Sequence, residues 1–218
     1  VSLPYIPPEL REDRGEIEAA RVGRLPALIE RRSLRGDLHV HTKASDGRNS
    51  IHEMALAAKA AGLEYIAITD HSPSLKIAHG LDSSRLARQI DEVDRMNQQD
   101  LGIVTLKGAE VDILENGELD CSQRLLARLD VVIGAVHSRF DLPRARQTER
   151  ILRAMDNRNF MILAHPTCRL IGTRQGIDID IEKIIRKAAE RRCILELNAQ
   201  PARLAPAAPW SQPPQAPG

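Results

Sequence analysis

Residues 131–137 read Val-Val-Ile-Gly-Ala-Val-His, an apolar run of strand length that ends in a histidine. Similar runs recur along the chain, at 36–41, 65–71, 103–113, 161–166 and 193–199. Amphipathic helical patterns separate them, near residues 50–61, 82–97, 119–128, 145–157 and 180–191. The alternation of almost uninterrupted apolar strands with helices predicts an α/β fold with a parallel sheet.

The strand ends favour a barrel over an open sheet. The six runs carry polar, chemically reactive residues at or near their ends. An open doubly wound sheet would more often carry a glycine-rich phosphate loop after its first strand, and none follows residues 36–41.

The first predicted helix has recognisable ends. Ser50 and Glu53, at its start, have the spacing of a capping box, and Gly62 follows its last residue.

Composition restricts the class of protein. Hydrophobic residues make up 42% of the chain but aromatic residues only 2%, so we expect an aliphatic core. A net charge of +1 gives no global basic field for nucleic acid. The three cysteines include no C-x-x-C pair, which favours a reducing cytoplasm over a disulfide framework. No apolar run reaches membrane length, so we expect no membrane partner.

Three regions differ in composition. Residues 1–35 combine proline-rich turns with a charged helical stretch from Glu16 to Glu30, and read as a linker. Residues 36–200 contain the strand–helix pattern. Residues 201–218 include six prolines and five alanines among 18 residues, which predicts a disordered tail.

The histidines mark the expected site. Five of the seven lie at or just past the end of a predicted strand, namely His39, His41, His71, His137 and His165. Active sites of βα barrels assemble at the carboxyl ends of the strands, so we expect these imidazoles to converge. Scattered polar strand ends would not explain why most are histidine. His39 and His41 should point the same way, opposite to Leu38 and Val40, and together can bind one divalent ion.

Two carboxylates join this set. Asp46 lies in the turn Ser45-Asp46-Gly47, where an ordinary turn aspartate is the alternative reading. Glu110 lies within an apolar strand, where a carboxylate is costly unless it is paired or metal-bound. The remaining polar candidates are not predicted to bind metal. His52 and His79 are interpreted as structural residues. Asp37, Asp70 and Asp120 are interpreted as partners that orient a ring nitrogen of a ligating histidine.

Five ordered motifs resemble the polymerase-and-histidinol-phosphatase (PHP) domain. They are His39-Val-His41-Thr, Ile68-Thr-Asp70-His71-Ser72, Gly108-Ala-Glu110, Val136-His137-Ser138 and Ala164-His165-Pro166. Ile6-Pro-Pro-Glu-Leu-Arg11, His165-Pro-Thr-Cys-Arg169-Leu170 and Asn198-Ala-Gln-Pro-Ala-Arg203-Leu204 further resemble the C-terminal PHP domain of bacterial family X DNA polymerases. The resemblance implies a distorted (β/α)7 TIM-like barrel, here incomplete with about six parallel strands.

The resemblance also implies divalent ions, Mn²⁺ or Zn²⁺, up to three in the family. His39, His41 and Glu110 would bind one ion, while Glu110 with His137 and His165 would bind a second, and Asp46 with His71 a third. The family completes the first and third sites with an Asp-x-His motif on its last strand. This sequence lacks that motif, so we expect a truncated barrel with fewer ions.

The implied reaction is phosphoester hydrolysis, with Glu110, His137 and His165 at its centre. Likeness to family X points to DNA 3′ ends in repair, through 3′→5′ exonuclease, 3′-phosphatase or abasic-site cleavage, with polymerase domains as N-terminal partners. Arg169 and Arg174 are the candidate phosphate-binding arginines. The alternatives are a free-standing histidinol-phosphatase-type enzyme, an inactive structural module that has lost its last strand, and an amidohydrolase, which the Glu110 bridge makes a poorer fit.

Overall fold

The computed structural model describes residues 3–11, 13, 15–198 and 203. The chain divides into two compact units, Val1–Leu34 and Arg35–Gly218. Apart from Arg203, the tail at 201–218 that the sequence predicts to be disordered lies outside the described residues.

The first unit contains less helix than the sequence predicts. Among its described residues, the one α-helix, α1, spans Glu16–Arg21, between the 3-10 turns Pro8–Leu10 and Arg31–Ser33. The prediction of a helical stretch from Glu16 to Glu30 is therefore wrong after Arg21. Gly23 adopts a left-handed φ of 67°, and Pro26 lacks the N–H that a continuing helix requires, so the chain leaves the helix after Arg21.

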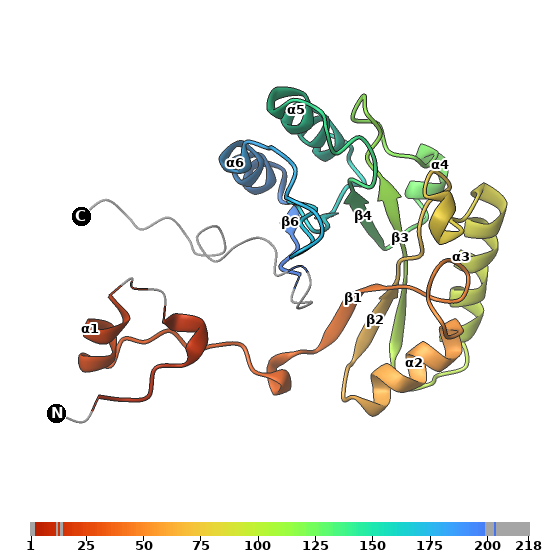
Figure 1. Cartoon of the computed structure of the whole chain (residues 1–218). Coiled ribbons are helices and arrows are strands. Elements are labelled where there is room, and N and C mark those ends of the chain that lie inside the picture. The colour runs from red at the N-terminus through yellow and green to blue at the C-terminus, as the bar shows by residue number, and fades with distance from the viewer. Residues whose placement is uncertain (1–2, 12, 14, 199–202, 204–218) are drawn as a thin grey trace. The chain divides into compact units, whose positions relative to one another are not determined.

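The second unit is an α/β domain with a six-stranded, all-parallel sheet in the order β1-β2-β3-β4-β5-β6. The strands are β1 Gly36–Val40, β2 Tyr65–Ile68, β3 Val104–Asp112, β4 Val131–Ala135, β5 Ile162–Leu163 and β6 Ile194–Leu195. They curl into a half-barrel, and the predicted parallel α/β architecture is confirmed (Figure 1).

The helices of this unit lie around the outside of the curved sheet (Figure 1). They are α2 Ile51–Ala60, α3 Ser83–Asn97, α4 Gln123–Leu126, α5 Arg144–Met155 and α6 Ile181–Arg191, with a 3-10 turn at Lys76–Ala78. The capping box of Ser50 and Glu53 is present at the start of α2. The helix expected at 119–128 is shorter, because Leu119 forms an antiparallel bridge with Ile113 and Ser122 caps the helix three residues later.

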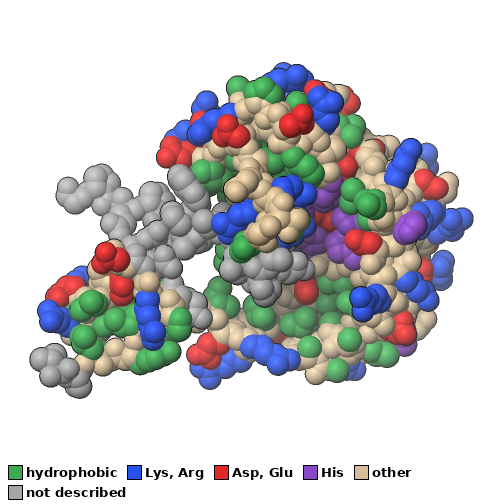
Figure 2. Space-filling view, in the orientation of Figure 1, with side chains coloured by type: hydrophobic (Ala, Val, Ile, Leu, Met, Phe, Trp, Pro, Cys, Tyr) green, Lys and Arg blue, Asp and Glu red, His purple; other side chains and the backbone are tan. Residues whose placement is uncertain are grey.

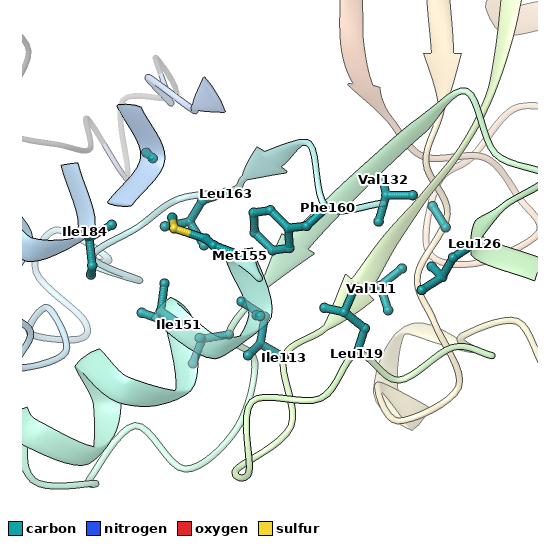
Figure 3. Packing of buried hydrophobic residues seen from close by; sticks show 14 of the residues in the cluster. Val111, Ile113, Leu119, Leu126, Val132, Ile151, Met155, Phe160, Leu163 and Ile184 are labelled. Carbon is teal, nitrogen blue, oxygen red and sulfur yellow. The ribbon is translucent and has the colours of Figure 1, made fainter. Parts of the chain in front are cut away.

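The core forms on both faces of the strands. Ile66 and Ile68 of β2 pack against α2 and α3, whereas Ala67 between them packs against the neighbouring strands. This alternation is the two-residue period of a strand. The inner cluster below the strand ends comprises Ala67, Val131, Ile133, Ala135, Ile162 and Ala164. The largest cluster, on the outer face of β3 and β4 beneath α5 and α6, includes Val111, Val132, Ile151, Met155, Phe160 and Ile184 (Figure 3).

One strand departs from simple alternation. The pairing of β1 with β2 shifts register between Asp37 and Val40. Leu38 therefore packs against the inner cluster while Val40 packs under α2, so the two do not share the face that the sequence predicts for them. Among the described residues, no helix combines the length and apolar character that a membrane span requires.

Candidate metal centre

The chemically reactive side chains meet at the carboxyl ends of the strands. His39 lies in β1 and Glu110 in β3, whereas His41, His71, His137 and His165 lie just past the ends of β1, β2, β4 and β5. Because all six strands run parallel, these ends form a single mouth. Histidine side chains gather there in one hollow (Figure 2).

Glu110 is the centre of the cluster. It is only 1% exposed, and each of its two carboxylate oxygens faces a different set of imidazoles. Oε2 lies 3.2 Å from His39 Nε2, 3.3 Å from His41 Nε2 and 3.0 Å from His71 Nδ1. Oε1 lies 3.3 Å from His137 Nε2 and 3.0 Å from His165 Nε2. A carboxylate in this position can bridge two cations.

His165 reaches the cluster through an unusual backbone. Ala164 belongs to the inner cluster and Leu163 to the outer one, so strand alternation would turn His165 away from the mouth. Its φ of 28° breaks that alternation. A positive φ is rare for a residue with a Cβ and is maintained only where the surrounding structure enforces it.

Glu110 also governs protonation in the metal-free protein. Burial raises the pKa of Glu110, but hydrogen bonds with His137, His165 and His39 outweigh burial and hold the pKa well below its usual value. Burial disfavours a charged His39, whereas Glu110 and Glu196 stabilise the charge and raise the pKa to about 10.

The pKa values of the other imidazoles depend on the charged groups beside each ring. Burial disfavours a charged His137, but Asp112 and Glu110 overcome this and raise its pKa to about 9. For His41 and His165, burial dominates and lowers the pKa. In the metal-free cluster, the pKa is thus raised at His39 and His137, whose Nδ1 atoms lie 2.6 and 2.5 Å from the carboxylates of Glu196 and Asp112. Metal binding has to displace a proton from a charged ring, since a ligating imidazole is neutral.

Asp46 completes one side of the cluster from the loop after β1. Its oxygens lie 3.4 Å from His41 Nδ1 and 3.5 Å from His71 Nε2. Gly47 makes this turn possible, because a Cβ there would approach the His41 carbonyl oxygen to 2.5 Å and Thr42 N to 2.7 Å. Any larger residue would push Asp46 away from the two imidazoles.

Two carboxylates behind the cluster were missed by the sequence reasoning. Asp112 Oδ1 lies 2.5 Å from His137 Nδ1, and Glu196 Oε1 lies 2.6 Å from His39 Nδ1. Glu196 Oε2 also accepts a hydrogen bond of 2.7 Å from the backbone N–H of His165. Such contacts orient a ligating ring and increase its basicity. Asp112 follows Glu110 by two residues on the same strand, which is the signal that could have identified it.

The aspartates that the sequence assigned to this orienting role have other partners. Asp37 accepts from the His39 backbone N–H, and Asp120 from that of Ser74. The assignment of these two and of Asp70 as ring partners is corrected accordingly. Asp70 is 1% exposed and binds the loop after β1, through Thr42 N and Oγ1, Ser45 Oγ and, from α3, Gln89 Nε2.

The donor set fits divalent metal ions. Three groups have ligand atoms within 4.8 Å of one another: His39, His41 and Glu110; His41, Asp46 and His71; His71, Glu110 and His137. Among the described residues, buried Nδ1 atoms of His41, His71 and His165 have no hydrogen-bond partner. His71 Nδ1 is close to Glu110 but lacks hydrogen-bond geometry, as expected where a cation would lie between them. His165 contacts Glu110 but belongs to none of the three groups.

The two candidate phosphate-binding arginines lie on the loop after His165. Arg174 donates from Nε and Nη2 to the Cys168 carbonyl oxygen at 2.9 and 2.7 Å, and its guanidinium lies 4.2 Å from the centre of the Phe140 ring. Arg169 donates from Nε and Nη2 to the Arg203 carbonyl oxygen at 3.3 and 3.1 Å. Both side chains thus fix the backbone beside the cluster.

Known proteins are similar to this chain in sequence. The chain is 46% identical over 202 residues to the DNA polymerase/3′-5′ exonuclease PolX of Bacillus subtilis, an alignment that covers 93% of this chain and 35% of the relative. It is 36% identical over 166 residues to a probable phosphatase of Acetivibrio thermocellus, covering 74% of this chain and 64% of the relative. The chain therefore spans about a third of the first relative and just under two thirds of the second.

A solved structure also aligns with this fold. It is the histidinol phosphate phosphatase of Lactococcus lactis complexed with zinc, L-histidinol and phosphate, with a TM-score of 0.47 and 18% identity over 75% of this chain and 73% of that one. Among protein families, the PHP domain matches residues 37–200, which include β2 to β6 in full and all but the first residue of β1. The chain belongs to the PHP domain family.

Proposed function

We propose that this domain is a metal-dependent phosphoesterase that acts on DNA 3′ ends, as a 3′→5′ exonuclease, a 3′-phosphatase or an abasic-site endonuclease. One observation carries the proposal. The buried Glu110 carboxylate lies between two sets of imidazoles, at 3.0–3.3 Å from five ring nitrogens. An arrangement of this kind suits more than one cation, because each oxygen faces its own set of imidazole nitrogens.

The donors suit Mn²⁺ or Zn²⁺, which accept mixed imidazole and carboxylate ligands. His39, His41, Asp46, His71, Glu110, His137 and His165 would hold the ions. When bound, such ions lower the pKa of water and stabilise negative charge on phosphoryl oxygens. A serine or cysteine nucleophile is not required for this chemistry.

The protein's own groups prepare the site. Glu110 stays ionised, since its hydrogen bonds with the imidazoles outweigh the effect of burial on its pKa. Asp112 and Glu196 fix the orientation of His137 and His39. Arg169 and Arg174 add positive charge on the loop after His165, where a phosphate would approach the cluster.

Similarity supports DNA as the substrate. The alignment with the polymerase/exonuclease covers 93% of this chain, including residues of the first unit, which we propose connect this domain to polymerase domains. The probable phosphatases favour a second candidate, phosphatase activity, which on this chain would be hydrolysis of a small phosphomonoester. These align over 74% of the chain. A structural module without activity is the remaining alternative.

The test compares substrates at a defined metal content. Chain 1–218 is stripped with a chelator, reloaded with Mn²⁺ or Zn²⁺, and assayed on oligonucleotides with a 3′-phosphate or a 3′-hydroxyl and on small phosphomonoesters. We expect DNA cleavage that requires metal and that Glu110→Gln reduces by more than about 100-fold, beyond the range typical of residues behind the ligands. His52→Ala, on the exposed face of α2, is the matched control.

Each outcome distinguishes the candidates. Hydrolysis of small phosphomonoesters without DNA cleavage would favour the small-molecule phosphatase. A folded protein that binds no ions would favour the structural module. Unchanged turnover in Glu110→Gln would show that the cluster does not perform the reaction.

A further inference from the structure

The side chain of Arg150 in α5 is buried beside the ends of β3 and β4, where it is only 1% exposed. Its Nη2 donates to the Ile113 carbonyl oxygen, and Nε donates to the Leu114 carbonyl oxygen at 3.2 Å. Nη1 donates to the Ser138 carbonyl oxygen at 3.0 Å and to Gln147 Oε1 at 3.2 Å. Within the described part of the chain, the guanidinium therefore donates its hydrogen bonds to neutral oxygens.

Packing alone does not explain a guanidinium at this position. A charged group is costly to bury, and an apolar side chain of similar volume would fill the same space without that cost. A guanidinium differs from such a side chain in having a rigid, planar set of N–H donors that point in several directions. It can therefore hold separate backbone segments at a fixed distance from each other.

The carbonyl oxygens that it binds belong to two segments that lead directly out of the metal centre. Ile113 follows Asp112, the last residue of β3, and Ser138 follows His137, which lies two residues past the end of β4. The paired register of the two strands ends at Asp112 and Ala135, so the ladder does not reach His137. Contacts other than the ladder must fix the backbone on either side of this imidazole.

Two side chains of α5 hold the segment after β4. Arg150 binds the Ser138 carbonyl oxygen, and Gln147 Nε2 donates to the Arg139 carbonyl oxygen at 2.7 Å. Arg139 has a φ of 54°, which a residue with a Cβ maintains only where its surroundings enforce it. Of the two side chains, Arg150 is the one that also binds the segment after β3. It thus connects the two strand ends.

We propose that Arg150 is a positioning residue of the metal centre, which sets the distance between the backbone after Asp112 and the backbone after His137. This inference rests on the proposed function. The contact that depends on this distance is the one of 2.5 Å between Asp112 Oδ1 and His137 Nδ1, which turns His137 Nε2 towards Glu110. Without the guanidinium, buried carbonyl oxygens lose their donors and the two segments separate. The His137 ring then loses the carboxylate that orients it.

The test measures metal coordination in the folded protein. Chain 1–218 is stripped with a chelator and titrated with Co²⁺, whose visible absorption spectrum reports the ligands and geometry around the ion. We expect Arg150→Met to weaken Co²⁺ affinity by roughly 10- to 100-fold, the loss typical when a ligating histidine loses the group behind it, and to change the spectrum of the bound ion. Arg150→Lys keeps the charge but lacks the planar fork, so it should recover only part of the affinity.

Ile151→Ala is the matched control for loss of stability. Ile151 is the next residue of α5 and is fully buried in the cluster on the outer face of the sheet (Figure 3). Its truncation destabilises the domain but removes no hydrogen-bond donor from either segment. At a temperature well below its unfolding transition, Ile151→Ala should bind Co²⁺ with the affinity and the spectrum of the wild-type protein.

Two results would overturn the positioning role. One is wild-type Co²⁺ affinity and spectrum in a folded Arg150→Met protein, and the other is an equal change in Ile151→Ala, which would assign the effect to general destabilisation. If Arg150→Met does not fold, Arg150→Gln, which retains one donor group, is judged by the same criterion. A wild-type protein that binds Co²⁺ but hydrolyses no phosphoester would refute the proposed function alone, because the Co²⁺ titrations would still decide the role of Arg150.

Discussion

Replacing Asp112 by asparagine tests whether the carboxylates behind the cluster control metal binding. Asp112 is 3% exposed, and its Oδ1 lies 2.5 Å from His137 Nδ1, on the side of the ring opposite Glu110. The charge of Asp112 makes His137 more basic and fixes the ring with Nε2 towards the cluster. Asparagine is nearly the same size and can still accept a hydrogen bond, so the substitution removes mainly the charge.

The expected magnitude follows from this geometry. Loss of a carboxylate behind a ligating histidine typically weakens metal affinity by about 10- to 100-fold, which corresponds to about 1.4–2.7 kcal/mol. Asp112→Ala should cost the fold a further ~1–3 kcal/mol, because it leaves His137 Nδ1 without an acceptor in a mostly buried position. The two variants therefore separate loss of charge from loss of the hydrogen bond.

The assay is titration of chelator-stripped protein with Mn²⁺ and Zn²⁺, followed by calorimetry, with chemical denaturation to measure stability. Asp91→Asn is the matched control, since Asp91 is an exposed carboxylate paired with Arg128 at 2.6 Å. A folded Asp112→Asn protein with wild-type affinity for both metals would refute the reasoning, because it would show that the orientation of His137 does not depend on this charge.

Further expectations concern pH, the loop after β1 and the core. The pKa values of about 10 for His39 and about 9 for His137 lie above the unperturbed 6.5, so both groups stabilise the metal-free protein below pH 6.5 and lose that contribution as pH rises through 9–10. Thermal unfolding with chelator should show a falling Tm across pH 7–10, and a flat profile would contradict it. Gly47→Ala should displace Asp46 and abolish binding of one ion, as counted by metal analysis; full ion content would contradict the steric argument. Ile133→Ala should destabilise the domain by ~2–5 kcal/mol in denaturant titration, and a loss below about 1 kcal/mol would mean that this fully buried side chain does not support the sheet.

The sheet could be predicted from sequence because its strands are buried on both faces. Ile66, Ala67 and Ile68 meet different clusters on the two sides of β2, so the run is apolar throughout and is bounded by polar residues. The site was predictable for a related reason. Parallel strands bring their carboxyl ends together, so histidines after β4 and β5 were expected at the same edge of the sheet. That His165 also turns into the cluster depends on its φ of 28°, which the sequence does not reveal.

Other features depend on distances that a sequence does not contain. Glu196 and His39 are 157 residues apart and meet only because β6 follows the curve of the sheet back towards the first strand. The sequence pattern predicted a helix from residue 119, but Leu119 forms a bridge with Ile113 instead, so α4 starts only after Ser122.

The loop that carries Asp46 shows how one short motif serves both the fold and the site. Asp70 and His71 are consecutive, yet His71 faces Glu110 while the Asp70 carboxylate binds the loop after β1. Asp70 accepts hydrogen bonds from Thr42 and Ser45 of that loop at 2.5–2.7 Å and from Gln89 of α3 at 2.5 Å. Each accepting oxygen therefore ties the loop to a buried part of the domain. Because the same strand end supplies the imidazole and the anchor, the position of Asp46 relative to His71 is fixed by neighbouring residues of the chain before any ion binds.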